Sequence, residues 1–236
     1  RTWLLRMAFG SRFPTLHQKG ADCHSTQHPK SVLMKLICVG RNYAKHIEEL
    51  QNDRPDVPVI FMKPDSCLGQ KGQPFFIPDF SNEIQHEVEV LVKINRIGKH
   101  IQTKFAHKYY DEIGLGLDFT ARDLQSELKA KGLPWEKAKS FDGAAYIGQW
   151  FDKSQFPNIN DLQFQLTKNG MVVQSDTTAN MMWGIDEVIS YVSRYFTLKI
   201  GDILFTGTPS GVGIVQNGDE LTGQLAGQHA FTLKIK

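Results

Sequence analysis

Two glutamates, Glu87 and Glu89, alternate with valines in the segment HEVEV at residues 86–90. Successive side chains of a β-strand point to opposite faces, so both carboxylates lie on one face, about 6.5–7 Å apart along the strand. Carboxylates at this spacing can converge on one cation. A strand with one face in water shows the same alternation, and the pattern alone favours that simpler interpretation.

Asp118 ends the otherwise apolar segment GLGLD and is a candidate third ligand. Burial of an aspartate is costly unless the carboxylate has a partner. Three carboxylates form an oxygen-rich site that suits Mg²⁺, Mn²⁺ or Ca²⁺ rather than zinc. Alternatively, Asp118 caps the helix that is expected at 121–132, and the sequence alone does not decide between the two roles.

His46 and Glu49 are three residues apart in a segment of helical character at 43–50. Residues at this spacing lie on one face of a helix and can touch. A histidine that a carboxylate orients is a common general base near neutral pH. The competing interpretation, an exposed pair on a surface helix, is the more frequent origin of this spacing.

Three further polar side chains could reach a substrate. Arg122 and Gln125 are also three apart, on the helix expected after Asp118, where they either bind a substrate carboxylate or face solvent. Lys139 is one of four lysines between residues 129 and 139, and its position carries no signal by itself.

The segment FTGTPSGVG contains Gly207 and Thr208. Glycines let the backbone approach a ligand closely and present N–H groups to an anion. The pattern of a Walker A loop is absent, and a tight connection between strands is the alternative explanation.

The elements that must position these residues are mostly strands. Alternating or continuous apolar runs predict them, at 35–40, 57–63, 86–94, 112–121, 162–174, 202–213, 219–225 and 230–236. Asn169-Gly170 predicts a tight hairpin turn inside the fifth of these runs. Helical patterns cover 43–50, 121–132 and 177–198, the last with an interruption at Gly184. Because strands and helices do not alternate strictly, the expected fold is a β-rich α+β domain.

Composition narrows the class of protein. The 236 residues carry a net charge of +2, which does not indicate binding to nucleic acid or to an anionic membrane. No apolar run reaches the roughly 18 residues that a membrane-spanning helix needs. The three cysteines, Cys23, Cys38 and Cys67, are scattered, which suits a reducing cytosol better than a disulfide scaffold.

Residues 1–33 differ from the rest of the chain. They hold five basic residues against one acidic residue, lack clear periodicity and end just before Met34. They are expected to lie outside the catalytic domain, either as an organelle-targeting segment or as sequence that precedes a start at Met34. Cytoplasmic localisation is the expectation, with mitochondrial localisation if the segment is a targeting sequence.

Five motifs in order, VGRNYAKHIEE, HEVEV, LDFTARDLQ, KGLPWEKAKSFD and FTGTPSGVG, resemble the fumarylacetoacetate hydrolase superfamily. The resemblance covers residues 34–236 and is closest to its small single-domain acylpyruvate hydrolases and oxaloacetate decarboxylases. It implies a fold like the C-terminal domain of fumarylacetoacetate hydrolase, a β-roll that usually forms a homodimer. It also overturns the preference for a solvent-facing strand at 86–90.

The resemblance assigns roles by position. It implies that Glu87, Glu89 and Asp118 hold Mg²⁺ or Mn²⁺, and that His46 and Glu49, on a segment that orders when ligand binds, activate water. Lys139 matches the family's active-site lysine. The positions implied to contact substrate are Arg41, Lys63, Arg122, Gln125, Gly207 and Thr208, of which Arg41 and Lys63 match least well.

The expected reaction is metal-dependent hydrolysis of the carbon–carbon bond of 2,4-dioxo acids such as acetylpyruvate or fumarylpyruvate, releasing pyruvate. The same site could decarboxylate oxaloacetate or interconvert its keto and enol forms. One alternative is an isomerase or decarboxylase of 2-hydroxy-diene-dioate intermediates of aromatic degradation. A non-catalytic metal-binding or small-molecule-binding relative is the other, because a fold alone does not establish activity.

Overall fold

The computed structural model describes residues 34–51 and 53–236, so the expected leader at 1–33 lies outside the described residues. The strands are β1 (Leu36–Gly40), β2 (Val59–Lys63), β3 (Ile84–His86), β4 (Val88–Ile94), β5 (Tyr110–Asp118), β6 (Thr120–Ala121), β7 (Ala145–Asp152), β8 (Gln163–Lys168), β9 (Met171–Thr177), β10 (Ile203–Phe205), β11 (Gly213–Ile214), β12 (Glu220–Leu225) and β13 (Gln228–Lys234). The helices are α1 (Ala44–Glu49), α2 (Thr103–Ala106), α3 (Arg122–Ala130), α4 (Glu136–Lys139) and α5 (Ile185–Tyr195). The predicted β-rich α+β class is confirmed.

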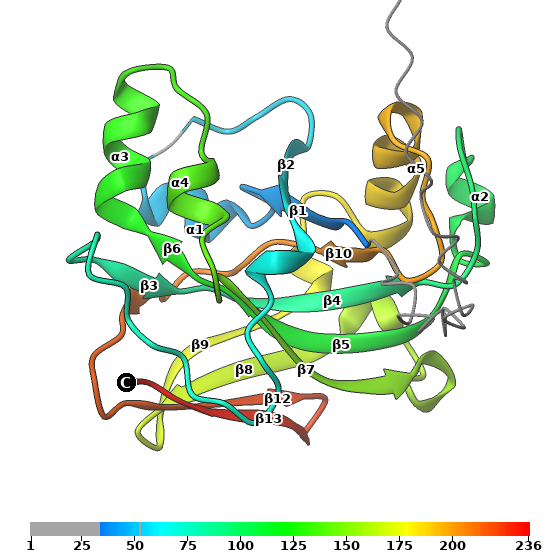
Figure 1. Cartoon of the computed structure of the whole chain (residues 1–236). Coiled ribbons are helices and arrows are strands. Elements are labelled where there is room, and N and C mark those ends of the chain that lie inside the picture. The colour runs from blue at the N-terminus through cyan, green and yellow to red at the C-terminus, as the bar shows by residue number, and fades with distance from the viewer. Residues whose placement is uncertain (1–33, 52) are drawn as a thin grey trace, which may run out of the picture. The chain divides into compact units, whose positions relative to one another are not determined.

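The strands form three sheets. A six-stranded sheet has the order β2-β1-β10-β4-β5-β7, a four-stranded sheet has the order β13-β12-β8-β9, and a small sheet has the order β11-β3-β6. Within the six-stranded sheet only β1 and β10 run parallel. Figure 1 shows the four-stranded sheet below β4 and β5, and the helices α3 and α4 above them, next to β6. No helix among the described residues has the length and apolar character to cross a membrane.

The core lies between the two larger sheets. Val88, Val90 and Val92 of β4 are fully buried in one cluster with Leu166 of β8 and Leu221 of β12. Because side chains alternate along a strand, Glu89 points to the opposite face of β4, which lies toward the helices. Burial of the valines therefore fixes the register that turns the glutamate away from the core.

Two neighbouring segments of the chain, each predicted as one strand, pass from one sheet to another at adjacent positions. The strand predicted at 86–94 is interrupted at Glu87, because β3 pairs with β6 and β11 while β4 pairs with β5 and β10. The strand predicted at 112–121 is interrupted at Phe119 in the same way, between β5 and β6. A continuous strand was the wrong prediction in both places. Strands that change sheets make corners, and this corner carries the candidate site.

Most other predicted elements are present. Asn169 and Gly170 have φ values of 53° and 80° and connect β8 to β9, so the predicted hairpin turn is confirmed. The helix expected at 177–198 is shorter, because α5 begins at Ile185, directly after the predicted interruption at Gly184. Strand β7 was not predicted, because Gly148 interrupts its apolar pattern.

Gly116 is required where β5 meets β7. A Cβ atom there would lie 2.3 Å from the carbonyl oxygen of Tyr146 and 2.7 Å from Leu91 Cδ1. Gly116→Ala is expected to destabilise the protein by about 1–3 kcal/mol, because the backbone of β7 must move away. Urea unfolding measures the change. Gly69→Ala is the control, since its nearest contact would be 3.6 Å, and equal stability of the two variants would contradict the prediction.

Candidate active site

The three predicted carboxylates converge at the corner. Glu87 and Asp118 face each other across β4 and β5, since Val88 pairs with Leu117 and the Asp118 N–H donates to the Glu87 carbonyl. One oxygen from each of Glu87, Glu89 and Asp118 lies within 4.8 Å of the others. Their exposed fractions are 4%, 2% and 1%, so a solvent-facing strand is the wrong interpretation. Asp118 caps no helix either, because α3 begins after Ala121 without a side-chain cap.

Buried cations surround two of the three carboxylates. Lys139 Nζ donates to Glu87 Oε2 at 2.7 Å and to Asp118 Oδ2 at 2.8 Å. Lys63 Nζ lies 2.7 Å from Asp118 Oδ1, in an ion pair that lacks the alignment of a hydrogen bond. Arg122 Nη2 forms an ion pair with Glu87 Oε1. Glu89 differs from the other two, because its Oε2 accepts only the Gly207 N–H, at 2.7 Å.

These surroundings shift the pKa values of the two glutamates in opposite directions. Burial acts to raise the pKa of Glu87, but the charges of Lys139 and Arg122 outweigh it and hold that pKa well below the usual range. Burial raises the pKa of Glu89, and the charges of Asp118 and Glu87 raise it further. Burial acts to lower the pKa of Lys139, but Asp118 and Glu87 outweigh it and raise that pKa, so the lysine stays cationic.

The donor set fits a hard divalent cation. Three convergent carboxylates, without a cysteine or histidine among them, are the ligands that Mg²⁺ and Mn²⁺ prefer. Glu89 is buried beside two like charges and no cation contacts it, which is costly unless a positive charge binds. Glu87, Glu89 and Asp118 could therefore hold a metal ion.

His46 and Glu49 form the predicted pair. His46 Nδ1 lies 3.2 Å from Glu49 Oε2, and the Gly211 N–H donates to the other oxygen of Glu49 at 2.9 Å. The glycine-rich loop 206–212 thus fixes the carboxylate that orients the imidazole. Burial lowers the pKa of His46, against the opposing effects of Glu87 and Glu49, so the ring is neutral near pH 7 and can accept a proton.

Gln174, which the sequence did not point to, anchors the same loop. It is 1% exposed, and its Nε2 donates to Thr208 Oγ1 at 2.9 Å and to the Pro209 carbonyl at 3.0 Å. Its Oε1 accepts the Val88 N–H at 3.0 Å and lies 3.0 Å from His86 Nδ1, which must therefore carry the proton. All four hydrogen-bonding positions of the amide are used.

Buried His86 makes stability depend on pH. Burial lowers its pKa below the ordinary value of 6.5, so the unfolded chain binds more protons than the folded chain as the pH falls through 6.5. The free energy of unfolding therefore decreases as the pH falls from above 6.5 to below it, by at most about 1.4 kcal/mol per pH unit for this histidine. Urea unfolding across this range should give a smaller slope for His86→Gln. His229→Gln, at an exposed position, should keep the wild-type slope, and equal slopes in all three proteins would disprove the prediction.

The candidate site residues enclose one small cavity of about 40 Å³. Nine of the twelve predicted residues line it: Arg41, His46, Glu87, Glu89, Asp118, Arg122, Gln125, Lys139 and Thr208. The other three, Glu49, Lys63 and Gly207, contact residues that do. Lys129, Phe61 and Trp135 also line it and were not predicted.

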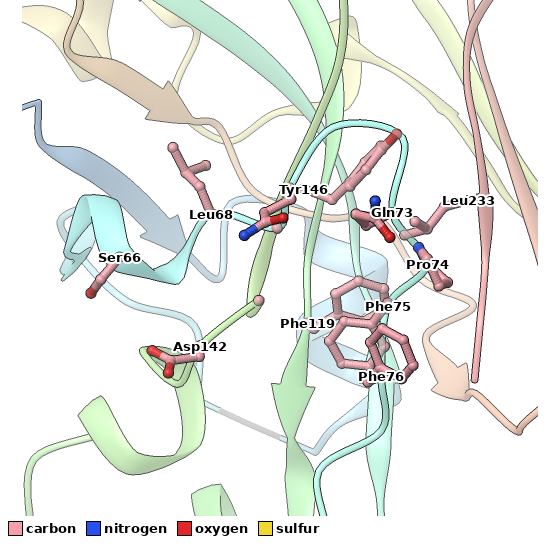
Figure 2. Close-up of a pocket in the computed structure, with 13 residues that line it drawn as sticks. Ser66, Leu68, Gln73, Pro74, Phe75, Phe76, Phe119, Asp142, Tyr146 and Leu233 are labelled. Carbon is pink, nitrogen blue, oxygen red and sulfur yellow. The ribbon is translucent and has the colours of Figure 1, made fainter.

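A second cavity, of about 480 Å³, is larger but contains none of these groups. Figure 2 shows Phe75, Phe76 and Phe119 clustered on one side of it, with Phe75 and Phe119 stacked at 4.0 Å between ring centroids. Asp142 is the only charged residue of its lining. This lining lacks the convergent carboxylates, cations and histidine of the smaller cavity, so the smaller cavity is the candidate active site.

The fold and the three carboxylates together define a β-rich protein with a buried site for a divalent cation. The chain belongs to the fumarylacetoacetate hydrolase family: the model of the fumarylacetoacetate (FAA) hydrolase C-terminal domain matches residues 35–235. The family resemblance and the fold that it implied are therefore confirmed.

Several relatives cover most of both chains. Mitochondrial oxaloacetate tautomerase FAHD1 of Bos taurus is 38% identical over 201 residues, which are 85% of this chain and 91% of that protein. Oxaloacetate tautomerase YcgM of Escherichia coli (strain K12) is 40% identical over 202 residues, 85% and 92% of the two chains. The crystal structure of fumarylpyruvate hydrolase from Pseudomonas aeruginosa, in complex with Mn²⁺ and pyruvate, has a TM-score of 0.81 at 30% identity and covers 93% and 99%.

Proposed function

We propose that this chain is a metal-dependent enzyme that forms the enol or enolate of 2-oxo acids, with keto–enol interconversion of oxaloacetate as its main reaction. The observation that carries the proposal is the buried contact of Lys139 with Glu87 and Asp118 beside Glu89. It places a fixed cation next to a metal site, where negative charge develops during enolisation. The names of the relatives at 38% and 40% identity support oxaloacetate as the substrate.

Glu87, Glu89 and Asp118 would hold Mg²⁺ or Mn²⁺. Bound there, the ion supplies Lewis-acid chemistry, which polarises a 2-oxo acid and makes its C3 protons more acidic. The protein's own groups do the rest of the work, and each has a position that suits one task.

Lys139 stabilises the enolate. An ammonium group has three protons to donate, and two are already bound by Glu87 and Asp118. The third is available for the oxygen that becomes negative as the enolate forms. Because the neighbouring carboxylates keep the lysine cationic, this donor is preorganised before the reaction begins.

His46 moves the proton. Its ring is neutral near pH 7 and lines the cavity, so it can take a proton from C3 of the keto form and deliver it to the enolate oxygen, which gives the enol, or run the same transfer in reverse. Glu49 orients the ring and stabilises the imidazolium that forms.

Hydrolysis of 2,4-dioxo acids is a second candidate, which the His46–Glu49 pair favours. Here the same base removes a proton from water, and the resulting hydroxide attacks the distal carbonyl. The carbon–carbon bond then breaks, its electron pair remains on the pyruvate enolate, and protonation of the enolate gives pyruvate and a carboxylic acid. Loss of CO₂ from oxaloacetate reaches the same enolate without water.

The experiment is a direct comparison of three reactions on one metal-loaded protein. Keto–enol interconversion of oxaloacetate is followed by its enol absorbance, and pyruvate release is followed from oxaloacetate and from acetylpyruvate, each with Mg²⁺, Mn²⁺ or EDTA. Metal-dependent interconversion that outpaces both releases of pyruvate supports the proposal. Faster cleavage of acetylpyruvate would establish the hydrolase instead, and inactivity in all three assays would overturn the enzyme assignment.

A further inference from the structure

Lys129 lies on the substrate side of α3. Arg122, Gln125 and Lys129 are spaced by three and four residues, so they form one face of this helix, and all three line the catalytic cavity. The side chain of Lys129 is partly buried, unlike that of Lys131, which is exposed. Helix geometry therefore directs one particular lysine of the Lys129–Lys139 region, besides Lys139, into the site.

Lys129 lines this cavity and has no anionic partner among the described residues. Each nitrogen of Arg122 has a partner, with Nε on Gln85 at 2.8 Å, Nη1 on Gln125 at 2.5 Å and Nη2 on the Glu87 carboxylate. Lys129 Nζ, by contrast, has no carboxylate or carbonyl partner within residues 34–51 and 53–236. It lies over the ring of Trp135, 5.4 Å from the centroid, in a cation–π contact.

The surroundings of Lys129 are positively charged. Burial lowers its pKa to about 8, and the charges of Arg41, Arg122 and Lys139 add to the effect, against a weaker opposing effect of Glu87. A half-buried ammonium group among like charges is unfavourable in the empty site. An anion that binds next to it would offset both the cost of burying this charge and the repulsion from the neighbouring cations.

The excess positive charge of the site favours a ligand with more than one negative group. Four cations line the cavity, Arg41, Arg122, Lys129 and Lys139, against three carboxylates, and the two charged groups directly behind it, Lys63 and Glu49, have opposite signs. A divalent metal ion would add to this positive excess. A substrate with one carboxylate at the metal leaves the charge of Lys129 unmet, whereas a dicarboxylate does not.

We propose that Lys129 binds the second, distal carboxylate of a dicarboxylic 2-oxo acid and so determines the specificity of the site. The Trp135 ring holds the ammonium group at the wall of the cavity, which Arg41 also lines. This inference rests on the proposed function for the position of the first carboxylate, and it narrows the substrate to dicarboxylates such as oxaloacetate or fumarylpyruvate.

An apolar cavity of about 290 Å³ provides the competing possibility. It opens beside the catalytic cavity and shares Phe61, Trp135 and Lys139 with it, while Met62 and Leu133 complete its apolar wall. A monocarboxylic substrate with an apolar distal group would occupy it and make no use of Lys129. Removing the charge of Lys129 should therefore weaken binding of a dicarboxylate and leave binding of a monocarboxylate unchanged.

The test compares binding of two ligands that differ by one carboxylate, pyruvate and oxaloacetate, to the Mn²⁺-loaded full chain. Calorimetry in a His46→Gln background measures binding while enolisation is suppressed, and pyruvate release from oxaloacetate is assayed in parallel so that decarboxylation is not counted as binding. Lys129→Met should weaken oxaloacetate binding by about 10-fold to 100-fold, because one charge-assisted hydrogen bond is lost. The same substitution should leave pyruvate binding unchanged. Lys129→Arg should keep the wild-type preference, and Lys131→Met, on an exposed position of the same helix, is the matched control.

Equal weakening of both ligands would show a general electrostatic effect and overturn the inference. So would unchanged binding of both, or the absence of a preference for oxaloacetate in the parent protein. Kinetics on proteins that retain His46 separate this inference from the proposed function. If the preference depends on Lys129 but no enolisation is detected, the carboxylate site stands and the proposed reaction fails.

Discussion

Glu89→Gln is expected to abolish metal-dependent activity without destabilising the metal-free protein. Glu89 contacts no cation, and its one hydrogen bond, from the Gly207 N–H, can be accepted equally well by a glutamine oxygen. The substitution removes a like charge from beside Glu87 and Asp118, so the fold should be at least as stable. Loss of a metal ligand should lower metal affinity by at least about 100-fold, since even groups behind the ligands are worth 10-fold to 100-fold.

Asp118→Asn provides the contrast that makes this prediction specific. Asp118 neutralises Lys63 and Lys139, so its loss leaves buried ammonium groups short of negative charge. This variant should lose activity as well, but its metal-free form should be destabilised by about 3–5 kcal/mol. Urea unfolding in EDTA, together with titration of Mn²⁺, measures both properties. Similar loss of stability in the two variants would refute the account of how the charges are paired.

His46→Gln is expected to reduce enolisation of oxaloacetate by about 10²-fold to 10⁴-fold, the usual contribution of a general base. Because burial lowers the pKa of His46, the wild-type kcat/KM should decline only below pH 6.5, as the ring becomes protonated. That acidic decline should be absent from the residual activity of the variant. Stopped-flow assays across the pH range measure both effects.

Two further variants test whether His46 acts chemically. Glu49→Gln should reduce the rate of enolisation less than His46→Gln does, because the ring remains but loses the carboxylate that orients it. His229→Gln, on the exposed surface, should leave both rate and pH profile unchanged. An active His46→Gln enzyme that keeps the acidic decline would assign the base to another residue.

The sequence was informative where local chemistry decides the structure. Alternation placed Glu87 and Glu89 on one face, and Asn169-Gly170 specified a hairpin, because each depends on a few neighbouring residues. The sequence was less informative where the structure depends on which strands pair with each other. Nothing in HEVEV shows that the strand changes sheets at Glu87, since that break depends on which strands lie beside each half.

The lysines show the same limit within the site. Neither spacing nor composition distinguishes Lys139 from the other lysines nearby, because what matters is its contact with Glu87 and Asp118. Lys129 shares a helix face with Arg122 and Gln125, but only the structure shows that this face lines the cavity. Strand β7 was missed because Gly148 interrupts its pattern. The structure explains this glycine, since a Cβ atom there would lie 2.7 Å from the Leu115 carbonyl and 2.8 Å from that of Ala230.

The parallel pairing of β1 with β10 has a consequence for how the protein folds. Leu36 lies near the start of the described residues and pairs with Ile203, and loop 206–212 follows β10 directly. The Gly211 N–H that fixes Glu49, and through it the ring of His46, reaches its partner across 162 residues of chain, a non-local contact of the kind that slows folding. The three metal ligands, by contrast, lie between residues 87 and 118 and meet through the pairing of β4 with β5, so refolding with Mn²⁺ should show capture of the ion before Gly211 fixes Glu49.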